Sequence, residues 1–474
     1  MYQATLSSVQ QHPVPDWYQD AKLGIFIHWT ISSVPAFAPT GHGDLQKILA
    51  DQPVEFLFAN QPYAEWYQNS LRIAGSPAQR YHLEKYGQNY AYEAFADEFN
   101  RQSQSWDPSA WTDLFQQAGA RYVVLVTKHH DGFLLWPART PNPFRPGYRS
   151  TRDITGELTS SVTSRGLKMG LYYSSALDWT FTPQPITNFG DLAASGPTSR
   201  QYRDYVENHW KELIERYDPW VLWSDIGYPP GYRLPELFAY YYNRKPEGVV
   251  NDRWGQLPAL FHNRLGRWLI NRIVVQQIRS GKFSSPTVPH RDYVTTEYAG
   301  YDQVPAFKWE ACRGIGHSFA YNQFERAEDH LTAPALIRLL AGTVSNNGNL
   351  LINVGPRPDG SIPAPQVEAL QGLGRWLAAN GESIYATRPW DHSRDQGDHG
   401  AEVLYTRKGS SLYAIVSALP ATGPLAIPNL PARQVSLLDT DAPLPFSRES
   451  GKLVIQLPAG MKKEEIPVVK IELM

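Results

Sequence analysis

The chain contains 474 residues, with 44 Lys and Arg against 46 Asp and Glu, which gives a formal net charge of −2. This balance, without a long basic block, argues against a nucleic-acid or acidic-membrane partner. The length exceeds one compact domain and predicts a barrel with a smaller module. The single cysteine agrees with a reducing compartment. Residues 1–20 lack signal-peptide features and no apolar run could cross a bilayer, so we expect a cytoplasmic protein unless a leader has been removed.

The first predicted strand is residues 23–27, an apolar run that ends at His28. Residues 38–100 are predicted to be mostly polar and helical, around an aromatic segment that carries Glu65 and Trp66. Asp107 followed by Pro108 is typical of a helix start, with the acid as N-cap and the proline as first helical residue.

Polar side chains then follow one predicted strand after another. The β-branched run that begins at Tyr122 ends at His129, His130 and Asp131. Further strands are predicted at 169–174, 220–225, 248–254 and 294–298, near Trp309 and at 349–354, and helices at 199–217, 234–243 and 364–380. This alternation of strand and helix favours a parallel barrel over a sandwich.

The character of the sequence changes near residue 385. Short alternating strands are predicted at 403–406, 412–416, 435–438, 453–457 and 468–473, separated by Pro, Gly and Asp turns. This pattern is typical of a small antiparallel β-sandwich, and it contains no cluster of catalytic residue types. We therefore expect a catalytic (β/α) barrel domain at 1–384 and a C-terminal β-sandwich domain at 385–474.

The segment 255–291 departs from the alternation. It contains no acidic residue, whereas it carries Arg264, Arg267, Arg272, Arg279, Lys282 and Arg291. Apolar residues recur at roughly helical spacing between Phe261 and Gly281. Such a helix either packs back on the barrel, which is the commoner outcome, or reaches a second subunit and forms a homo-oligomer.

Asp225 closes the strand 220–225, just before the turn-forming Gly227 and Pro229. Catalytic groups of (β/α) barrels lie where strands end and loops begin. Trp223 points to the same side as Asp225, and an acid that faces inward beside an indole is costly unless it has a role. Taken alone, Asp225 could equally cap the next helix.

A second acid, Glu297, also closes an apolar segment, and Arg253 can neighbour either acid. Paired carboxylates at strand ends, among His, Arg, Tyr and Trp, are what glycoside cleavage requires. The arginine would keep the attacking carboxylate ionised or orient the other one. Spacing alone does not single out this pair, because four other acids lie near strand ends, namely Asp131, Asp178, Asp252 and Glu310.

The adjacent His129 and His130 raise the question of a metal site. Neighbouring residues of a strand point to opposite faces, so two such histidines do not easily share one ion. The His-Glu-x-x-His spacing of many zinc sites is absent. We expect these histidines to bind substrate hydroxyls, with a buried structural role as the alternative for each, and we expect neither a metal nor another cofactor.

Ten motifs occur in order along residues 16–380. They are Ala-Lys-Leu-Gly-Ile-Phe-Ile-His-Trp, Ala-Glu-Trp-Tyr, Thr-Lys-His-His-Asp-Gly-Phe, Leu-Tyr-Tyr-Ser, Leu-Trp-Ser-Asp, Val-Asn-Asp-Arg-Trp-Gly, Thr-Glu-Tyr, Lys-Trp-Glu, Ser-Phe-Ala-Tyr-Asn and Gly-Asn-Leu-Leu-Ile-Asn-Val-Gly-Pro. Together they resemble the successive motifs of the α-L-fucosidases of glycoside hydrolase family 29. The resemblance implies an irregular (β/α)8-type barrel followed by a C-terminal antiparallel β-sandwich, a retaining mechanism and no metal.

Carried over position by position, the resemblance implies that Asp225 is the nucleophile and Glu297 the acid/base. It also implies a fucose pocket with Trp29 and Trp254 behind it. The residues of that pocket are His28, Glu65, Trp66, His129, His130, Tyr172, Trp223 and Arg253. Segment 255–291 is an insertion relative to compact members of the family, and its place beside the site suits a leaving-group subsite.

The function implied by the resemblance is a retaining, exo-acting α-L-fucosidase that hydrolyses terminal fucosyl residues of fucosylated glycans or aryl fucosides. Two alternatives stay open. One is a non-catalytic fucose-binding protein on the same barrel. The other is a hydrolase of a related glycoside, such as a galactoside that shares the hydroxyl pattern of L-fucose.

Overall fold

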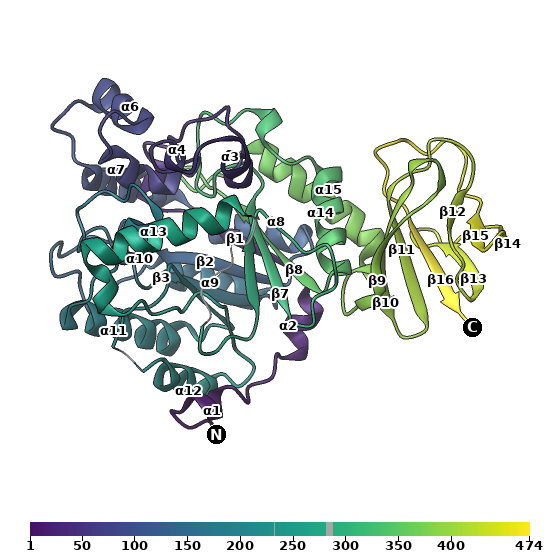
Figure 1. Cartoon of the computed structure of the whole chain (residues 1–474), viewed down its shortest axis with the longest axis horizontal. Coiled ribbons are helices and arrows are strands. Elements are labelled where there is room, and N and C mark those ends of the chain that lie inside the picture. The colour runs from purple at the N-terminus through teal and green to yellow at the C-terminus, as the bar shows by residue number, and fades with distance from the viewer. Residues whose placement is uncertain (232, 281–287) are drawn as a thin grey trace.

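The computed structural model describes residues 1–231, 233–280 and 288–474. An eight-stranded parallel sheet, curled among helices, is followed along the chain by antiparallel sheets (Figure 1). The parallel strands are β1 (Leu23–Ile27), β2 (Tyr122–Lys128), β3 (Lys168–Ser174), β4 (Val221–Asp225), β5 (Val249–Val250), β6 (Val294–Glu297), β7 (Trp309–Gly314) and β8 (Gly348–Val354). No helix among the described residues is long and apolar enough to cross a membrane.

Helices precede, connect and cover these strands. They are α1 (Leu6–Val9), α2 (Asp16–Ala21), α3 (Leu45–Asp51), α4 (Val54–Ala59), α5 (Tyr67–Leu71), α6 (Pro77–Tyr86), α7 (Phe95–Gln102), α8 (Pro108–Gln117), α9 (Ile154–Ser164), α10 (Phe189–Ala194), α11 (Arg200–Tyr217), α12 (Leu234–Arg244), α13 (Arg264–Arg279), α14 (Ala333–Ser345) and α15 (Ala364–Asn380). Helix α8 begins as predicted, since Asp107 accepts the Ser109 N–H at 2.8 Å and Pro108 follows as first helical residue.

The strands run in the order β5-β4-β3-β2-β1-β8-β7-β6, and all neighbouring pairs are parallel. Strands β1, β2, β4 and β8 are buried along their whole length, because side chains of the sheet fill one face and helices cover the other. This curled parallel sheet confirms the predicted irregular barrel architecture. The parallel register places the carboxyl ends of the strands, and the loops that follow them, at one end of the sheet.

Strands β5 and β6 are the two edges of this sheet, and the described residues form no ladder between them. Hydrogen bonds of Asp292 and Asp252 join these two edges instead. Asp292 donates its N–H to the Val250 carbonyl at 3.0 Å and accepts the Val250 N–H on Oδ2 at 2.7 Å. Asp252 Oδ1 accepts the Thr295 N–H at 3.0 Å. We call this β5–β6 junction the seam.

The antiparallel part has one sheet in the order β13-β16-β11-β10-β9 and another in the order β12-β15-β14. Its strands are β9 (Arg388–Gln396), β10 (Glu402–Lys408), β11 (Ser411–Ala418), β12 (Leu425–Pro428), β13 (Ala432–Leu437), β14 (Phe446–Glu449), β15 (Lys452–Ile455) and β16 (Val468–Leu473). The two sheets share a separate apolar core. Helix α14 contacts β9 and β10, and Arg338 of that helix donates to the Ser417 carbonyl at 2.7 Å.

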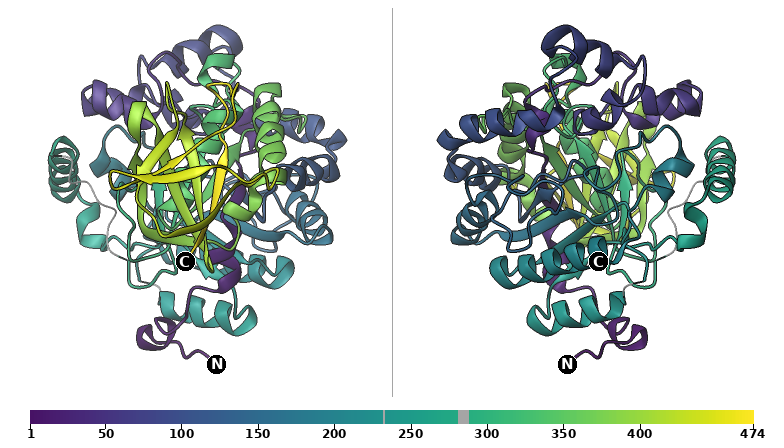
Figure 2. Two further views of the ribbon diagram at one scale, coloured as in Figure 1. Left: turned by 90° about the vertical axis from the view of Figure 1, so that its right-hand side faces the viewer. Right: turned by 90° about the vertical axis from the view of Figure 1, so that its left-hand side faces the viewer.

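Helix α13 is the helix that was predicted within the 255–291 insertion. Lys282, one of the basic residues of this insertion, lies outside the described residues. The helix packs on α10, where the Asn271 side chain accepts the Phe189 N–H at 3.1 Å. Two of its arginines lie near acids of neighbouring helices, since Arg267 lies 3.7 Å from Asp191 and Arg279 lies 3.8 Å from Glu55. The helix, drawn in teal, lies at the outer edge of the molecule (Figure 2).

Candidate active site

Asp225 is the last residue of β4, and its carboxylate is held by donors on both oxygens. Tyr172 Oη donates to Oδ2 at 2.8 Å, and Arg253 Nη1 donates to Oδ1 at 3.0 Å. Burial raises the pKa of Asp225, but the Arg253 charge and the Tyr172 hydrogen bond outweigh burial and hold this pKa below its ordinary value. The helix-cap interpretation is wrong, because α12 begins at Leu234 and is capped by no side chain.

Arg253 also reaches the second acid. Its Nη2 donates to Glu297 Oε2 at 3.2 Å, and its Nε donates to Thr295 Oγ1 at 2.9 Å. Thr295 in turn donates its hydroxyl to Asp252 Oδ1 at 2.7 Å, so the seam fixes the plane of the guanidinium. One planar guanidinium thus holds the carboxylate at the end of β4 and the carboxylate at the end of β6 next to each other.

Tyr63 completes the environment of Glu297, donating its hydroxyl to Oε1 at 2.7 Å. The ring of Tyr63 is buried against Phe319, at 5.2 Å between ring centroids. Tyr63 is not among the pocket residues that the family resemblance implies. Its position directly before the Ala-Glu-Trp-Tyr motif was the available signal.

Two neutral histidines offer hydrogen-bond acceptors next to Asp225. Burial lowers the pKa of His28 to about 4 and that of His130 to about 3. His130 Nδ1 lies 2.6 Å from Ser174 Oγ, whose own proton is donated to the Leu177 carbonyl, so Nδ1 carries the proton. The free Nε2 then lies 3.8 Å from Asp225 Oδ2, beyond hydrogen-bond distance, so its lone pair is available to a substrate hydroxyl.

The same reasoning fixes the tautomer of His28. Its Nδ1 lies 2.6 Å from Asn353 Oδ1, and the amide nitrogen of Asn353 donates to the Phe319 carbonyl at 2.6 Å. Because the oxygen of Asn353 only accepts, His28 Nδ1 donates and its Nε2 stays an acceptor. Both histidines therefore present lone pairs that suit the hydroxyl protons of a sugar.

The opposite-face prediction for His129 and His130 is wrong. Their ring centroids lie 3.9 Å apart. Strand β2 ends at Lys128, so the alternation of a strand does not extend to these two residues. The ring of His129 lies parallel to that of Tyr172 at 5.8 Å, and its buried Nδ1 has no hydrogen-bond partner. Burial lowers the pKa of His129 well below its ordinary value.

Glu65 and Trp66 come from the short 3-10 turn η2 (Ala64–Trp66) before α5. Glu65 is buried, and its Oε2 accepts the Ala320 N–H at 2.9 Å. Burial raises the pKa of Glu65 to about 7. The ring of Trp66 lies edge-on to that of His130, 5.4 Å away between centroids. This pair adds a carboxyl group and an aromatic wall to the histidine side of the site.

Trp223 forms the floor beneath the acids. Its ring stacks on Tyr172 at 5.4 Å, the Arg253 guanidinium lies 4.8 Å above it, and its Nε1 donates to Glu310 Oε1 at 3.0 Å. In contrast, Trp29 and Trp254 point into the helical layer: Trp29 packs on Trp106 and Trp111, and Trp254 packs on Trp210 and Phe238.

The other four acids near strand ends are each engaged by neighbouring side chains. Glu310 accepts from Tyr18, Tyr122 and Trp223; Asp131 accepts from Tyr92; Asp178 pairs with Lys128; and Asp252 accepts from Thr295. Asp225 and Glu297 are the two that share one arginine. An ionised acid, a second and more exposed acid, hydroxyl acceptors and aromatic rings together suit cleavage of a glycosidic bond.

Comparisons with known proteins agree with this geometry. A family model described as α-L-fucosidase matches residues 1–382, and one described as the α-L-fucosidase C-terminal domain matches residues 396–472. The α-L-fucosidase of Dictyostelium discoideum is 32% identical over 443 residues, covering 90% of this chain and 83% of that protein.

Two solved structures extend the similarity to three dimensions. The Thermotoga maritima α-fucosidase in complex with fucose is 39% identical with a TM-score of 0.84, covering 99% of this chain and 100% of that chain. The same enzyme in complex with a mechanism based inhibitor is 39% identical with a TM-score of 0.83, covering 100% of both chains. This chain therefore belongs to the α-L-fucosidases of glycoside hydrolase family 29 and is a glycoside hydrolase.

Proposed function

We propose that the protein is a retaining, exo-acting α-L-fucosidase with Asp225 as nucleophile and Glu297 as acid/base. The observation that carries this proposal is the single guanidinium of Arg253, which hydrogen-bonds both carboxylates. Retaining glycosidases need two carboxyl groups about 5–5.5 Å apart, on either side of the anomeric carbon. A shared arginine is a simple means of holding two carboxylates that close.

In the first step, the Asp225 carboxylate attacks the anomeric carbon. Glu297, in its protonated form, gives its proton to the glycosidic oxygen as the bond from that oxygen to the anomeric carbon breaks. The aglycone leaves as an alcohol, and fucose is joined to Asp225 as an ester. In the second step, Glu297 removes a proton from water, the water oxygen attacks the anomeric carbon, and Asp225 is released.

The environments of the two acids suit these different tasks. The Asp225 side chain is 11% exposed and the Glu297 side chain is 24% exposed. A nucleophile works best when it is ionised and shielded, whereas an acid/base must meet both the leaving group and the incoming water. The pKa of Asp225, below its ordinary value, keeps the nucleophile charged.

The remaining pocket residues bind the fucosyl group. His28 and His130 accept protons of its hydroxyls through Nε2, and His129 and Glu65 add further polar contacts. Trp66, Tyr172 and Trp223 supply aromatic faces for the C–H groups and the methyl group of the sugar. The substrates are then fucosylated glycans or aryl fucosides. The fucose and mechanism based inhibitor complexes of the Thermotoga maritima enzyme support this class of ligand for this fold.

The first test is release of 4-nitrophenol from 4-nitrophenyl α-L-fucoside, with 4-nitrophenyl β-D-galactoside alongside. Rapid turnover of the fucoside alone supports the proposal. Turnover of the galactoside instead favours a hydrolase of a related glycoside. Fucose binding measured by calorimetry, without turnover of either substrate, favours a non-catalytic binding protein.

A further inference from the structure

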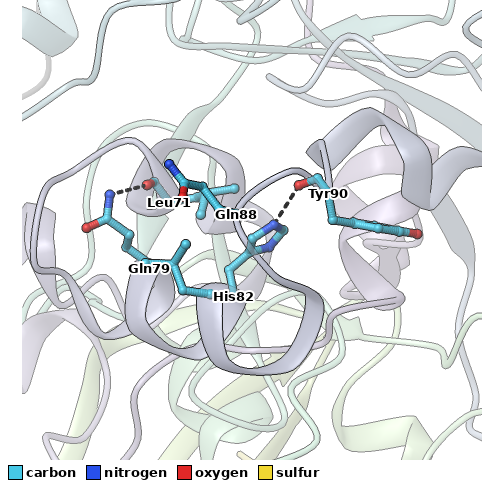
Figure 3. A pocket seen from close by; sticks show the side chains of 6 residues that line it. Leu71, Gln79, His82, Gln88 and Tyr90 are labelled. Carbon is cyan, nitrogen blue, oxygen red and sulfur yellow. Dashed lines mark hydrogen bonds between the residues drawn. The ribbon is translucent and has the colours of Figure 1, made fainter.

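Two cavities lie outside the active site. One, of about 480 Å³, lies among α5, α6 and Tyr90 (Figure 3). Two of its polar side chains are already bonded within the protein: His82 contacts the Tyr90 carbonyl and Tyr67 Oη, and Gln79 donates to the Leu71 carbonyl. The other, of about 40 Å³, lies among the loops after β3, β4 and β5 and has room for only a few water molecules. We assign neither cavity a function.

The two carboxylate oxygens of Glu297 have different partners. Oε2 accepts a hydrogen bond from Arg253 Nη2 at 3.2 Å, and Oε1 accepts one from Tyr63 Oη at 2.7 Å. A guanidinium only donates and stays charged, whereas a tyrosine hydroxyl is neutral and can donate or accept. The two oxygens therefore differ in how well they can carry the proton that an acid/base must hold before the first step.

The proton of Glu297 belongs on Oε1. In a protonated carboxyl group the carbonyl oxygen keeps more negative charge than the hydroxyl oxygen and is the better acceptor. Hydrogen bonds from a charged donor are stronger than those from a neutral one, so Arg253 favours the form in which Oε2 is the carbonyl oxygen. The hydroxyl oxygen is then Oε1, the atom that Tyr63 contacts.

Tyr63 is a donor held in place by its surroundings. Its side chain is buried, and its ring packs edge-on against Phe319 and stacks on Tyr298, with centroids 5.2 Å and 6.1 Å away. Burial and the charge of Glu297 raise the pKa of Tyr63 well above its ordinary value, so the hydroxyl keeps its proton. The bond from Tyr63 occupies one lone pair of Oε1, which leaves the other for the acidic proton.

The hydrogen bond from Tyr63 becomes stronger as Glu297 gives up its proton. Before the transfer, Oε1 is the weakly accepting hydroxyl oxygen of a neutral carboxyl group. Afterwards it belongs to a carboxylate, and hydrogen bonds to ionised acceptors are shorter and stronger. An interaction that gains strength along a reaction step lowers the barrier of that step. The step is cleavage of the glycosidic bond, in which the proton moves from Oε1 to the glycosidic oxygen and the Tyr63 proton stays on Oη.

We propose that Tyr63 is a positioning residue for proton transfer by Glu297. Its hydroxyl directs the acidic proton through the bond that it makes to Oε1, and it stabilises the carboxylate that the transfer leaves behind. The inference rests on the proposed α-L-fucosidase function and adds a residue to its first step. The effect of Tyr63 must grow with the need of the leaving group for a proton, which a merely structural tyrosine would not show.

The test uses Tyr63→Phe, which removes the hydroxyl and keeps the ring. We expect it to lower kcat/KM for methyl α-L-fucoside by about tenfold or more, and kcat/KM for α-L-fucosyl fluoride by no more than about twofold. Tyr240→Phe is the matched control, because Tyr240 Oη also donates to a carboxylate at 2.7 Å, that of Glu215, on the protein surface. The control should change neither value.

A double-mutant cycle separates positioning from structure. With phenyl α-L-fucoside, whose leaving group is intermediate, Tyr63→Phe should lower kcat/KM in the unaltered enzyme. In Glu297→Ala it should change kcat/KM by no more than about twofold, because the hydroxyl then has no carboxylate to act on. Equal losses on methyl α-L-fucoside and α-L-fucosyl fluoride, no loss on either, or the same loss in both backgrounds would overturn the inference.

Failure of the proposed function would look different. An unaltered enzyme that does not hydrolyse α-L-fucosyl fluoride would contradict the proposed function, and with it the role of Tyr63. An unaltered enzyme that hydrolyses all three substrates, with equal losses caused by Tyr63→Phe, would contradict the role of Tyr63 alone.

Discussion

Arg253 is the residue on which the charge state of the site depends, because it contacts both acids and the Trp223 ring. Burial lowers the pKa of this guanidinium, but the two carboxylates outweigh burial and raise it well above its ordinary value. The arginine is therefore permanently charged, and it stabilises the ionised form of Asp225.

Replacement of Asp225 tests its assignment as the nucleophile. Asp225→Ala should reduce turnover of 4-nitrophenyl α-L-fucoside about a thousandfold or more, because it removes the carboxylate that forms the glycosyl ester. Asp97→Ala, on the exposed side of α7, is a matched control that should keep full activity. Residual activity of Asp225→Ala within tenfold of the unaltered enzyme would refute the nucleophile assignment.

Replacement of the acid/base should depend on the leaving group. Glu297→Ala should lower kcat/KM for methyl α-L-fucoside by about 10²–10⁴-fold, because its alkoxide leaves poorly without a proton. The same substitution should lower the rate of the first step with α-L-fucosyl fluoride much less, because fluoride is a leaving group that needs little protonation. Single-turnover measurements with both substrates check this. Equal losses on both would assign Glu297 a role in positioning rather than proton transfer.

Most of the site residues could be located from the motifs, because these residues lie at strand ends. At such a position an apolar run ends and a polar residue follows. Asp225, Arg253 and Glu297 were placed together on this basis, and the structure brings them together. Tyr63 and Thr295 were not found, because their roles come from hydrogen bonds across the fold rather than from a local pattern. The orientation of His129 also depends on a strand end that the sequence does not mark.

At the scale of elements, the seam is the part of the barrel that residue patterns did not reveal. Hydrogen bonds of buried polar residues take the place of a ladder between β5 and β6. The positions of these residues follow no hydrophobic periodicity in the sequence. Asp292 is the centre of this group, with contacts to His12 Nδ1 at 2.8 Å, Tyr242 Oη at 2.9 Å and Val250 N at 2.7 Å. His12 thereby ties the N-terminal segment to the seam.

The seam gives a prediction for stability against pH. Burial lowers the pKa of His12, but the hydrogen bond and charge of Asp292 outweigh burial and raise this pKa above its ordinary value of 6.5. A raised pKa contributes stability below the ordinary value, and that contribution is lost as pH rises through the folded-state pKa. The free energy of unfolding contributed by His12 should therefore be smaller at about pH 9 than at about pH 6.

Urea unfolding of the unaltered protein and of His12→Asn at both pH values checks this contribution. The destabilisation caused by the substitution should be larger at the lower pH. The same destabilisation at both values would contradict a charged His12–Asp292 pair. His392→Asn is the matched control, because His392 pairs with Asp395 on the exposed surface of β9, where such a pair contributes little.

The predicted strands β10, β11, β13, β15 and β16 were identified because they alternate clearly, whereas β9, β12 and β14 were missed. Strand β14 is Phe-Ser-Arg-Glu and mostly exposed, and β9 carries several charged residues. Such strands are stabilised by ladder hydrogen bonds to their neighbours rather than by an apolar face of their own.

At the scale of the molecule, we propose that residues 1–384 and 385–474 are two domains, the first carrying the site and the second a structural sandwich. The C-terminal part has an apolar core of its own, and the barrel core continues into it through Leu404, Tyr413 and Ile415. Hydrogen bonds from α14 and α15 join them, since Arg338 donates to the Ser417 carbonyl and Trp376 to the Ile466 carbonyl. Substitutions on the solvent side of the sandwich should leave kcat/KM unchanged.

Helix α13 also carries a proposal for self-association. Its outer face exposes four large apolar residues, Leu265, Trp268, Leu269 and Ile273, with exposed fractions of 72%, 55%, 41% and 46%. We propose that this face contacts a second copy of the chain, because a contiguous exposed apolar face is commonly covered by a partner. Light scattering should then give a mass above 53.6 kDa, and Trp268→Glu should reduce it. A single mass of 53.6 kDa at all concentrations would end this proposal.

The stereochemistry of hydrolysis tests the central claim most directly. Proton NMR spectra recorded during the first minutes of 4-nitrophenyl α-L-fucoside hydrolysis distinguish the anomer released by the enzyme from the one formed later by mutarotation. Double displacement through Asp225 predicts that α-L-fucose appears first. Initial release of β-L-fucose would mean a single displacement by water and would contradict the covalent intermediate.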